Sequence, residues 1–235
     1  VHDQSSSGST LFIEPMSIVD LNNDIKQLVI DEKREIERIL KVISEKIARN
    51  ADSLLHNCEI MAQLDFAFAK AKLARKMHAT MPEINDEGIV NLAKARHPLL
   101  NKDNVVPIDI RLGEGYRTLL ITGPNTGGKT VSMKTLGLLV LMTQSGLFIP
   151  VQSGSKISIF QNVYADIGDE QSIEQSLSTF SAHMRNIVNI LNNIEHDDLL
   201  LLDEVGSGTD PEEGAALAMS ILERLMEIGA CTVAT

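Results

Sequence analysis

The most constraining feature of this sequence is a glycine-rich loop at residues 123–130, GPNTGGKT. It matches the pattern G-x-x-x-x-G-K-[ST], in which backbone N–H groups surround the phosphates of a nucleotide. The apolar run at residues 118–122 predicts a strand before the loop. Apolar residues at helical spacing predict a helix after it, with Met133, Leu136, Val140 and Leu141 on its core face. The alternative is a turn that ends in Lys-Thr by chance, and the flanking strand and helix argue against it.

Each residue of this loop is expected to contact a bound nucleotide. The helix N-terminus adds the positive end of its dipole to the inward-facing N–H groups. Lys129 is expected to reach the β- and γ-phosphates of ATP and to be catalytic, and the Thr130 hydroxyl to hold Mg²⁺. The expected nucleotide-binding residues are Gly123, Pro124, Asn125, Thr126, Gly127, Gly128, Lys129 and Thr130.

A second motif is the run LLLLDE at residues 199–204. Continuous apolar runs are typical of buried parallel strands, and ligands of open α/β sheets bind at the carboxyl ends of such strands. We therefore expect Asp203 to hold Mg²⁺ through water, and Glu204 to orient or deprotonate the attacking water. The alternative is a solvent-exposed Asp-Glu pair with no chemical role.

Two further segments surround these motifs. Ser178 or Thr179 is expected to cap a helix whose core face holds Phe180, Met184, Ile187, Leu191 and Ile194; the hydroxyls suit an anion, or form an ordinary cap. Residues 206–209 predict a flexible loop, and Asp210 with Pro211 predicts the start of a helix, with Glu213 in capping-box position and Gly229 at its end. A strand is expected to begin at Cys231.

Composition limits the remaining possibilities. The net charge is −11 and the sequence has no obvious polybasic surface, so charge alone does not indicate that the protein binds nucleic acid. Cys58 and Cys231 lack metal-ligand spacing and are expected to be buried free thiols. Neither a signal peptide nor a membrane span is predicted, which favours a cytoplasmic protein. Because the chain begins without Met and ends inside a predicted strand, we expect a fragment.

The first part of the chain differs in character from the rest. Residues 10–13 predict a short strand, and residues 19–77 contain almost no Gly or Pro, which predicts long helices. Ile36, Leu40, Ile43 and Ile47 form a narrow apolar stripe of coiled-coil type. These helices are interpreted either as an ordinary helical hairpin or as a lever. We place the domain boundary at Asn85, with a helical segment at residues 1–85 and an incomplete P-loop domain at 86–235.

The motifs GPNTGGKT, LSTFSAHM and LLLLDEVGSGTDPEEGAAL occur in one order. In that order they resemble the ATPase domain of the MutS family, a relative of ABC-type ATPases. The opening SSSGSTLFIEP, the stretch ARHPLL and the residues DPEEG after DEVGSGT resemble the MutS-two branch, which lacks mismatch-reading domains. This resemblance covers the whole chain. It implies an α/β P-loop NTPase domain of ABC/MutS type with a mainly parallel sheet, truncated at its C-terminus and preceded by a helical core or lever.

The resemblance also implies partners and roles. Asn125 would contact the γ-phosphate, Ser178 would complete the ATP site of a partner subunit, and residues 206–210 would cross the interface of a homodimer. Members of this branch are associated with branched DNA in suppression of recombination, and with rescue of stalled ribosomes, which implies DNA and rRNA as partners. Their endonuclease activity would come from a C-terminal domain absent here.

These observations together predict a dimeric, Mg²⁺-dependent ATPase that couples ATP to closure on a nucleic acid. One alternative is an ABC-type ATPase of chromosome maintenance, in which the stripe around Ile36 begins a long coiled coil. LSTFSAHM in place of a Gly-Gly-Gln signature argues against it. The other alternative is a nucleotide-dependent clamp with negligible turnover. The intact residues Lys129, Asp203 and Glu204 argue against that.

Overall fold

The computed structural model describes residues 3–4, 11–12, 15–101, 103–124, 127–168 and 176–235. Asn125 and Thr126, two of the expected nucleotide-binding residues, lie outside this set. The chain divides into two compact units, Val1–Asp65 and Phe66–Thr235. This division differs from the boundary that we place at Asn85, because strand β3 (Glu83–Asn85) pairs within the second unit with β7 (Lys156–Ser158).

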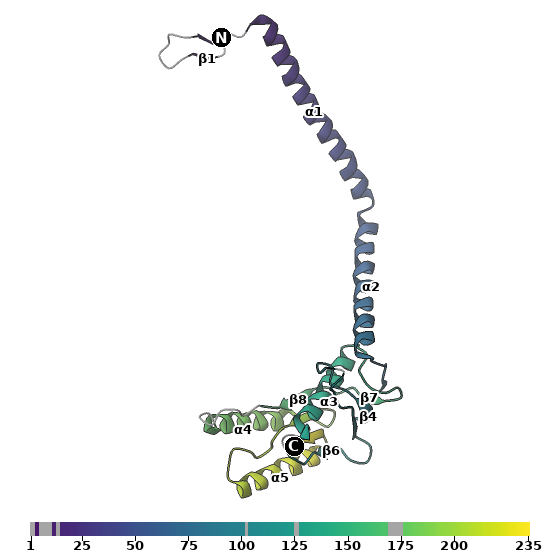
Figure 1. Ribbon diagram of the computed structural model, residues 1–235, viewed down its shortest axis with the longest axis vertical. Helices are drawn as coiled ribbons and strands as arrows, with labels where there is room; N and C mark the ends of the chain where they lie inside the picture. Colours follow the sequence, from purple (N-terminus) through teal and green to yellow (C-terminus); the bar gives the residue numbers. More distant parts are fainter. Residues whose placement is uncertain (1–2, 5–10, 13–14, 102, 125–126, 169–175) are drawn as a thin grey trace. The chain divides into compact units, whose positions relative to one another are not determined.

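The first unit is mainly helical, as expected. Two short strands, β1 (Asp3–Gln4) and β2 (Leu11–Phe12), pair in antiparallel fashion and are followed by α1 (Met16–Arg49) and α2 (Ala51–Met77), which runs on into the second unit (Figure 1). Asn50 interrupts the helix. The stripe through Leu40 is about half exposed, and Cys58 is exposed, so the expectation that its thiol is buried is wrong. None of the helices formed by the described residues has the length and apolar content to cross a membrane.

The second unit contains a parallel sheet with the strand order β6-β10-β9-β8. This confirms the predicted α/β class and the predicted strands before the phosphate loop, before the two acids and from Cys231 onward. The sheet places the last of these strands in the centre, beside the strand that carries the acids. Its members are β6 (Thr118–Leu120), β8 (Val163–Asp166), β9 (Leu199–Leu202) and β10 (Cys231–Ala234).

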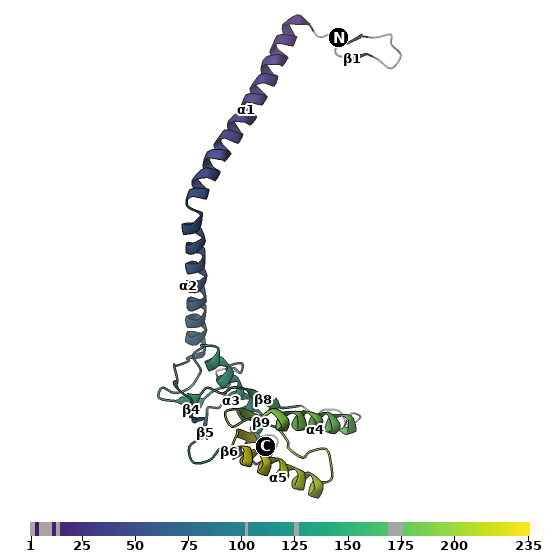
Figure 2. The ribbon, with the colours of Figure 1, turned by 180° about the vertical axis from the view of Figure 1, so that it is seen from behind.

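Helices cover both faces of this sheet. Leu199 and Leu201 of β9 join a core with α3 (Lys129–Gln144) on one face. Leu200 and Leu202 pack with α4 (Ser176–Asn193) and α5 (Pro211–Ile228) on the other face (Figure 2). A strand buried on both faces explains the run of four leucines.

The predicted core faces of two helices are partly corrected. In α3, Leu141 is half exposed and Leu139 is buried instead, because helix geometry brings residues 133, 136, 139 and 140 to the sheet. Ile190 of α4 is buried together with the predicted Ile187 and with Ile194, which directly follows the helix.

A second, mixed sheet packs into the same core as α3. Its strand order is β3-β7-β4-β5, with β4 (Val90–Ala95) antiparallel to β5 (Ile108–Leu112). Val90, Leu92 and Leu112 are almost fully buried in the core that α3 shares.

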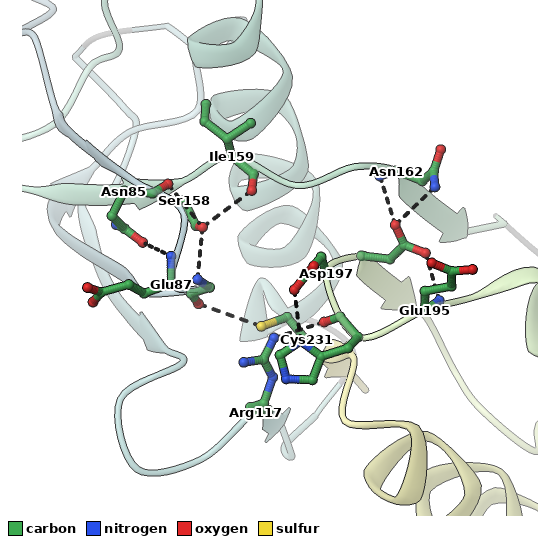
Figure 3. A network of polar contacts seen from close by, with 12 residues as sticks. Asn85, Glu87, Arg117, Ser158, Ile159, Asn162, Glu195, Asp197 and Cys231 are labelled. Carbon is green, nitrogen blue, oxygen red and sulfur yellow. Dashed lines mark hydrogen bonds and ion pairs between the residues drawn. The ribbon is translucent and has the colours of Figure 1, made fainter.

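A polar network lies at the amino-terminal edge of the parallel sheet (Figure 3). Asp198, which is fully buried, accepts hydrogen bonds from the backbone and the side-chain amide of Asn162 at 2.9 and 3.0 Å, and from the backbone N–H of Glu195 at 2.8 Å. Arg117 donates to the carbonyl of His196 at 2.9 Å. Burial raises the pKa of the Cys231 thiol in this network; nearby Arg117 opposes that shift and Asp197 adds to it.

Candidate functional site

The phosphate loop follows the edge strand β6, as predicted. The N–H of Ile121 donates to the carbonyl of Ala234 at 2.8 Å, which extends the β6–β10 ladder up to the start of the loop. Gly123 has φ +140° and Gly128, the N-cap of α3, has φ +78°. Residues that carry a side chain rarely adopt these backbone angles. No described atom would lie within 4 Å of an added Cβ at either position. The glycines therefore serve the backbone path and leave open space beside it.

Lys129 and Thr130 are the first two residues of α3. The Lys129 ammonium donates to the carbonyl of Gly123 at 2.7 Å. The positive charge near the end of the loop therefore lies beside the first residue of the loop. Thr130 is half buried in the same helical turn. Positive charge and a helix N-terminus are thus concentrated at one end of α3, which is the arrangement that binds phosphate.

Asp203 and Glu204 follow β9 at its carboxyl end. Asp203 is 9% exposed, and its N–H donates to the carbonyl of Asp166 at 2.9 Å. Its Oδ1 accepts a hydrogen bond from the hydroxyl of Thr235. Glu204 is exposed and has φ +50°, a left-handed conformation that costs a residue with a side chain about 1–2 kcal/mol. The bend turns the chain away from the strand directly after Asp203.

The sheet order brings these two motifs to one edge. All four strands are parallel, so the loop after β6 and the acids after β9 both lie at the carboxyl edge, with β10 between them. Two strand spacings separate β6 from β9 by about 10 Å. That span suits a nucleotide whose phosphates lie on the loop and whose terminal phosphate lies toward the acids.

A third acid, Asp166, lies at the same edge. It ends β8, is 8% exposed, and accepts hydrogen bonds from the His183 ring at 3.0 Å and from the Asn186 amide at 2.8 Å, both on α4. The side chain of Asp166 therefore holds α4 against the sheet next to Asp203. Our sequence reasoning did not identify this residue or its strand. Its position at the carboxyl end of a short run, VYAD, is the signal that could have found it.

A small pocket opens beside the acids, on the side of β9 away from the phosphate loop. Polar residues from β8, α4 and the segment after β9 line it, with Met184 and Ile187 at its apolar wall. Its polar lining consists of Asp166, His183, Asp203, Glu204 and Ser207.

The segment after the acids folds back on α5 through two glycines. A Cβ on Gly206 would lie 2.3 Å from the carbonyl oxygen of Gly214, and a Cβ on Gly214 would lie 2.2 Å from that of Gly206. The two backbones are therefore in direct contact, which explains glycine at both ends of GSGTDPEEG. The Asp210 side chain caps α5 by accepting from the N–H of Glu212 at 3.0 Å, as its position predicted.

Two expectations about helix starts are corrected. Helix α4 begins at Ser176, so Ser178 is its third residue and not its cap; the Ser178 side chain lies outside the described part of the structure. The Glu213 carboxylate accepts from the Thr209 hydroxyl at 3.4 Å, which ties the helix to the preceding loop in place of the predicted capping box. Gly229, with φ +79°, ends α5 as predicted.

The residues present fit Mg²⁺ bound together with a nucleotide. Within the described residues, no group of three or more His, Cys, Asp or Glu side chains could hold a metal by itself. Mg²⁺ commonly takes one or two protein oxygens and completes its shell with water and phosphate. In the described part of the chain, Oδ2 of Asp203 accepts no hydrogen bond, while Oδ1 accepts one. This nearly buried carboxylate thus keeps an oxygen for a water or a metal.

Comparison with known proteins agrees with the geometry. The family model for MutS domain V matches residues 119–235. Proteins named "Endonuclease MutS2" from Geobacillus sp. (strain WCH70) and Agathobacter rectalis are each 61% identical to this chain over all 235 residues. The protein of that name from Caldanaerobacter subterraneus subsp. tengcongensis is 57% identical over the same length. The chain spans 30% of the length of each of these relatives.

Proposed function

Because this chain belongs to the MutS family and carries its domain V, a P-loop ATPase domain, we propose that it binds Mg-ATP at the carboxyl edge of the parallel sheet and hydrolyses it. The observation that carries the proposal is the meeting of the phosphate loop and the Asp203–Glu204 pair at one edge, one strand apart. Membership of the family supports a nucleotide-dependent activity. The roles of individual residues are our own proposal.

We assign phosphate binding, metal binding and water activation to different residues of the chain. Backbone N–H groups of the phosphate loop, other than at Pro124, and the Lys129 ammonium bind the phosphate oxygens. Lys129 then exchanges its hydrogen bond to the carbonyl of Gly123 for one to phosphate. Asp203 and Thr130 hold the metal. Mg²⁺, when bound, neutralises charge on the terminal phosphates. Glu204 orients or deprotonates a water for in-line attack on the γ-phosphorus, and its exposed carboxylate just beyond Asp203 suits that role.

Two substitutions in the full-length protein test this division of roles. Lys129→Ala is expected to abolish tight ATP binding, since the phosphates lose a charged hydrogen-bond donor. Glu204→Gln is expected to keep nucleotide binding and to stop turnover, since the amide cannot accept the proton of water. Matched controls are Lys156→Ala and Glu223→Gln, which change exposed residues of β7 and α5. Normal hydrolysis by Glu204→Gln would show that the role assigned to Glu204 is wrong.

We also propose that the full-length protein works as a homodimer in which Ser178 completes the partner's ATP site. Helix α4, which carries Ser178, is hydrogen-bonded to Asp166, and Asp166 in turn accepts from the N–H of Asp203. A contact at the N-terminus of α4 is therefore linked by hydrogen bonds to the acids at the sheet edge. Mixing inactive Ser178→Arg subunits with inactive Lys129→Ala subunits should restore one working site per mixed dimer. No gain in activity, with mixed dimers shown to form, would exclude a composite site.

The third part of the proposal concerns the nucleic-acid partner of the full-length protein. We propose that ATP turnover is coupled to DNA, branched DNA in particular, or to ribosomes through rRNA. ATPase assays on the full-length protein with branched DNA, linear duplex DNA and ribosomes separate these partners by which one stimulates turnover. The endonuclease activity in the relatives' names is expected from a domain outside these residues.

A further inference from the structure

Thr235 occupies the gap between the two halves of the proposed ATP site. It directly follows β10, the strand that lies between β6 with its phosphate loop and β9 with its acids. Its backbone continues the parallel pairing with β9: its N–H donates to the carbonyl of Leu202 at 3.0 Å, and its carbonyl accepts from Val205 at 3.2 Å. The side chain therefore lies at the sheet edge where both motifs end.

The hydroxyl of Thr235 uses both of its hydrogen-bonding functions on the two acids. It donates to Oδ1 of Asp203, and it accepts from the backbone N–H of Glu204 at 3.0 Å. A threonine hydroxyl has one proton to donate, so this donor is fully committed to Asp203. One atom thus bridges the expected metal-binding residue and the expected water-activating residue.

Each contact has a consequence for chemistry. The bond to Asp203 orients the carboxylate through Oδ1 and leaves Oδ2 without a hydrogen bond from the described residues. The bond from the N–H of Glu204 holds a residue whose φ of +50° is unfavourable for any residue with a side chain. Lys94, another residue with positive φ, is held similarly, since its N–H donates to the Asp109 carboxylate at 2.8 Å. In both places a side-chain oxygen stabilises a strained backbone.

We propose that Thr235 is a positioning residue for ATP hydrolysis, acting through Asp203 and Glu204 without contacting the reacting atoms. This inference rests on the proposed ATPase function. The hydroxyl fixes the two acids relative to each other, so that the metal ligand and the water-activating carboxylate keep one geometry during turnover. Groups that orient metal ligands from outside the first coordination shell commonly change affinity or activity by about 10- to 100-fold when removed.

The test compares three substitutions in the full-length protein. Thr235→Val keeps the shape and removes the hydroxyl, whereas Thr235→Ser keeps the hydroxyl and removes the methyl group. Thr232→Val is the matched control, because Thr232 is fully buried on the same strand and its hydroxyl is bonded to the carbonyl of Ala230, away from the acids. Turnover, the Mg²⁺ concentration that gives half-maximal turnover, and ADP affinity without Mg²⁺ are measured for each, with circular dichroism to verify folding.

Thr235→Val is expected to lower kcat by about 10- to 100-fold and to raise the Mg²⁺ requirement, with Mg²⁺-free ADP affinity unchanged. Thr235→Ser and Thr232→Val should remain close to the parent protein. If Thr235→Val does not fold, the comparison of Thr235→Ala with Thr235→Ser replaces it. The proposal is overturned if Thr235→Val retains the parent's kcat and Mg²⁺ dependence, if Thr235→Ser is equally impaired, or if Thr232→Val loses as much activity.

The same assays separate this inference from the function on which it rests. If Glu204→Gln and Lys129→Ala lose turnover while Thr235→Val does not, the ATPase assignment stands and the role of Thr235 is wrong. If Glu204→Gln hydrolyses ATP normally, the division of roles itself fails.

Discussion

Strand β9 has an aspartate just beyond each end, and the two carboxylates are held in opposite ways. Asp198, before the strand, is fully buried and accepts three hydrogen bonds from N–H groups of Asn162 and Glu195. Asp203, after the strand, is 9% exposed and accepts one from the described residues, donated by the Thr235 hydroxyl. Four leucines separate them. We call the amino-terminal edge, where the carboxylate is surrounded by hydrogen-bond donors, the closed end of the sheet, and the carboxyl edge, where an oxygen of the carboxylate has no donor among the described residues, the open end.

The difference shows how the environment assigns a role to a carboxylate. Hydrogen-bond donors from neighbouring loops satisfy Asp198, so it stabilises those loops and has little capacity for a ligand. Asp203 retains an oxygen without a donor among the described residues, close to the strained backbone of Glu204. Polar groups left partly unsatisfied, and residues held in unfavourable conformations, are concentrated at functional sites because a ligand completes them.

Changing Asp203 to Asn is expected to have the largest effect, and on activity. The amide keeps the size of the side chain but loses the charge that we propose holds Mg²⁺, so turnover should fall on the order of 100-fold or more. The free energy of unfolding should change by less than about 1 kcal/mol, because one hydrogen bond is affected. ATPase assays and urea unfolding of the full-length protein measure both quantities.

The same Asp→Asn change at Asp198 should give the reverse result. Its amide NH₂ would face N–H donors of Asn162 or Glu195, so the free energy of unfolding of this domain should fall by about 2–4 kcal/mol. Turnover per folded molecule should stay near that of the parent protein. A stable Asp198→Asn variant, or an inactive but well-folded one, would contradict the contrast between the two ends.

Gly214→Ala tests whether the open end depends on close backbone packing. Helix propensity alone predicts that alanine stabilises a helical position by about 1 kcal/mol over glycine. The contact with the carbonyl oxygen of Gly206, 2.2 Å from the new Cβ, predicts destabilisation by about 1–3 kcal/mol, together with reduced turnover. The sign of the change in urea unfolding therefore decides between the two effects.

The smallest expected effect concerns the two thiols. Cys231 lies in the closed network, and burial raises its pKa, whereas Cys58 is exposed. At neutral pH, a thiol reagent should label Cys58 rapidly and Cys231 slowly in the native chain, because the thiolate is the reactive form. The neutral thiol is the form that folding favours, so this contribution to stability is complete below the usual cysteine pKa and declines as pH rises above it.

The labelling experiment has a direct control. A Cys58→Ser variant should show almost no rapid labelling from these two residues, and unfolding in urea should expose Cys231 to the reagent. Rapid labelling of Cys231 in the folded protein would show that the amino-terminal edge is more open than its hydrogen bonds indicate.

Local sequence determined a large part of this protein. The phosphate loop, the apolar strand with its two acids, the capped helix from Pro211 to Ile228 and the long N-terminal helices each have their signal within a few consecutive residues. Turn chemistry, apolar periodicity and capping act over such short distances, so one sequence is enough to predict them. The exposed Cys58 and the exposed Leu141 were mispredicted, because burial depends on what packs against a helix.

Tertiary structure alone decided which side chains meet at the site. Thr235 reaches Asp203 across 32 positions of sequence, and His183 reaches Asp166 across 17. The strand order β6-β10-β9-β8 does not follow the chain, so neighbours at the sheet edge come from distant segments. The close contact of Gly206 with Gly214 and the saturation of Asp198 likewise depend on how loops pack. Sequence motifs were enough to select Asp203 and Glu204 as candidate site residues, whereas the groups that hold these acids in place depend on the packing of the whole sheet.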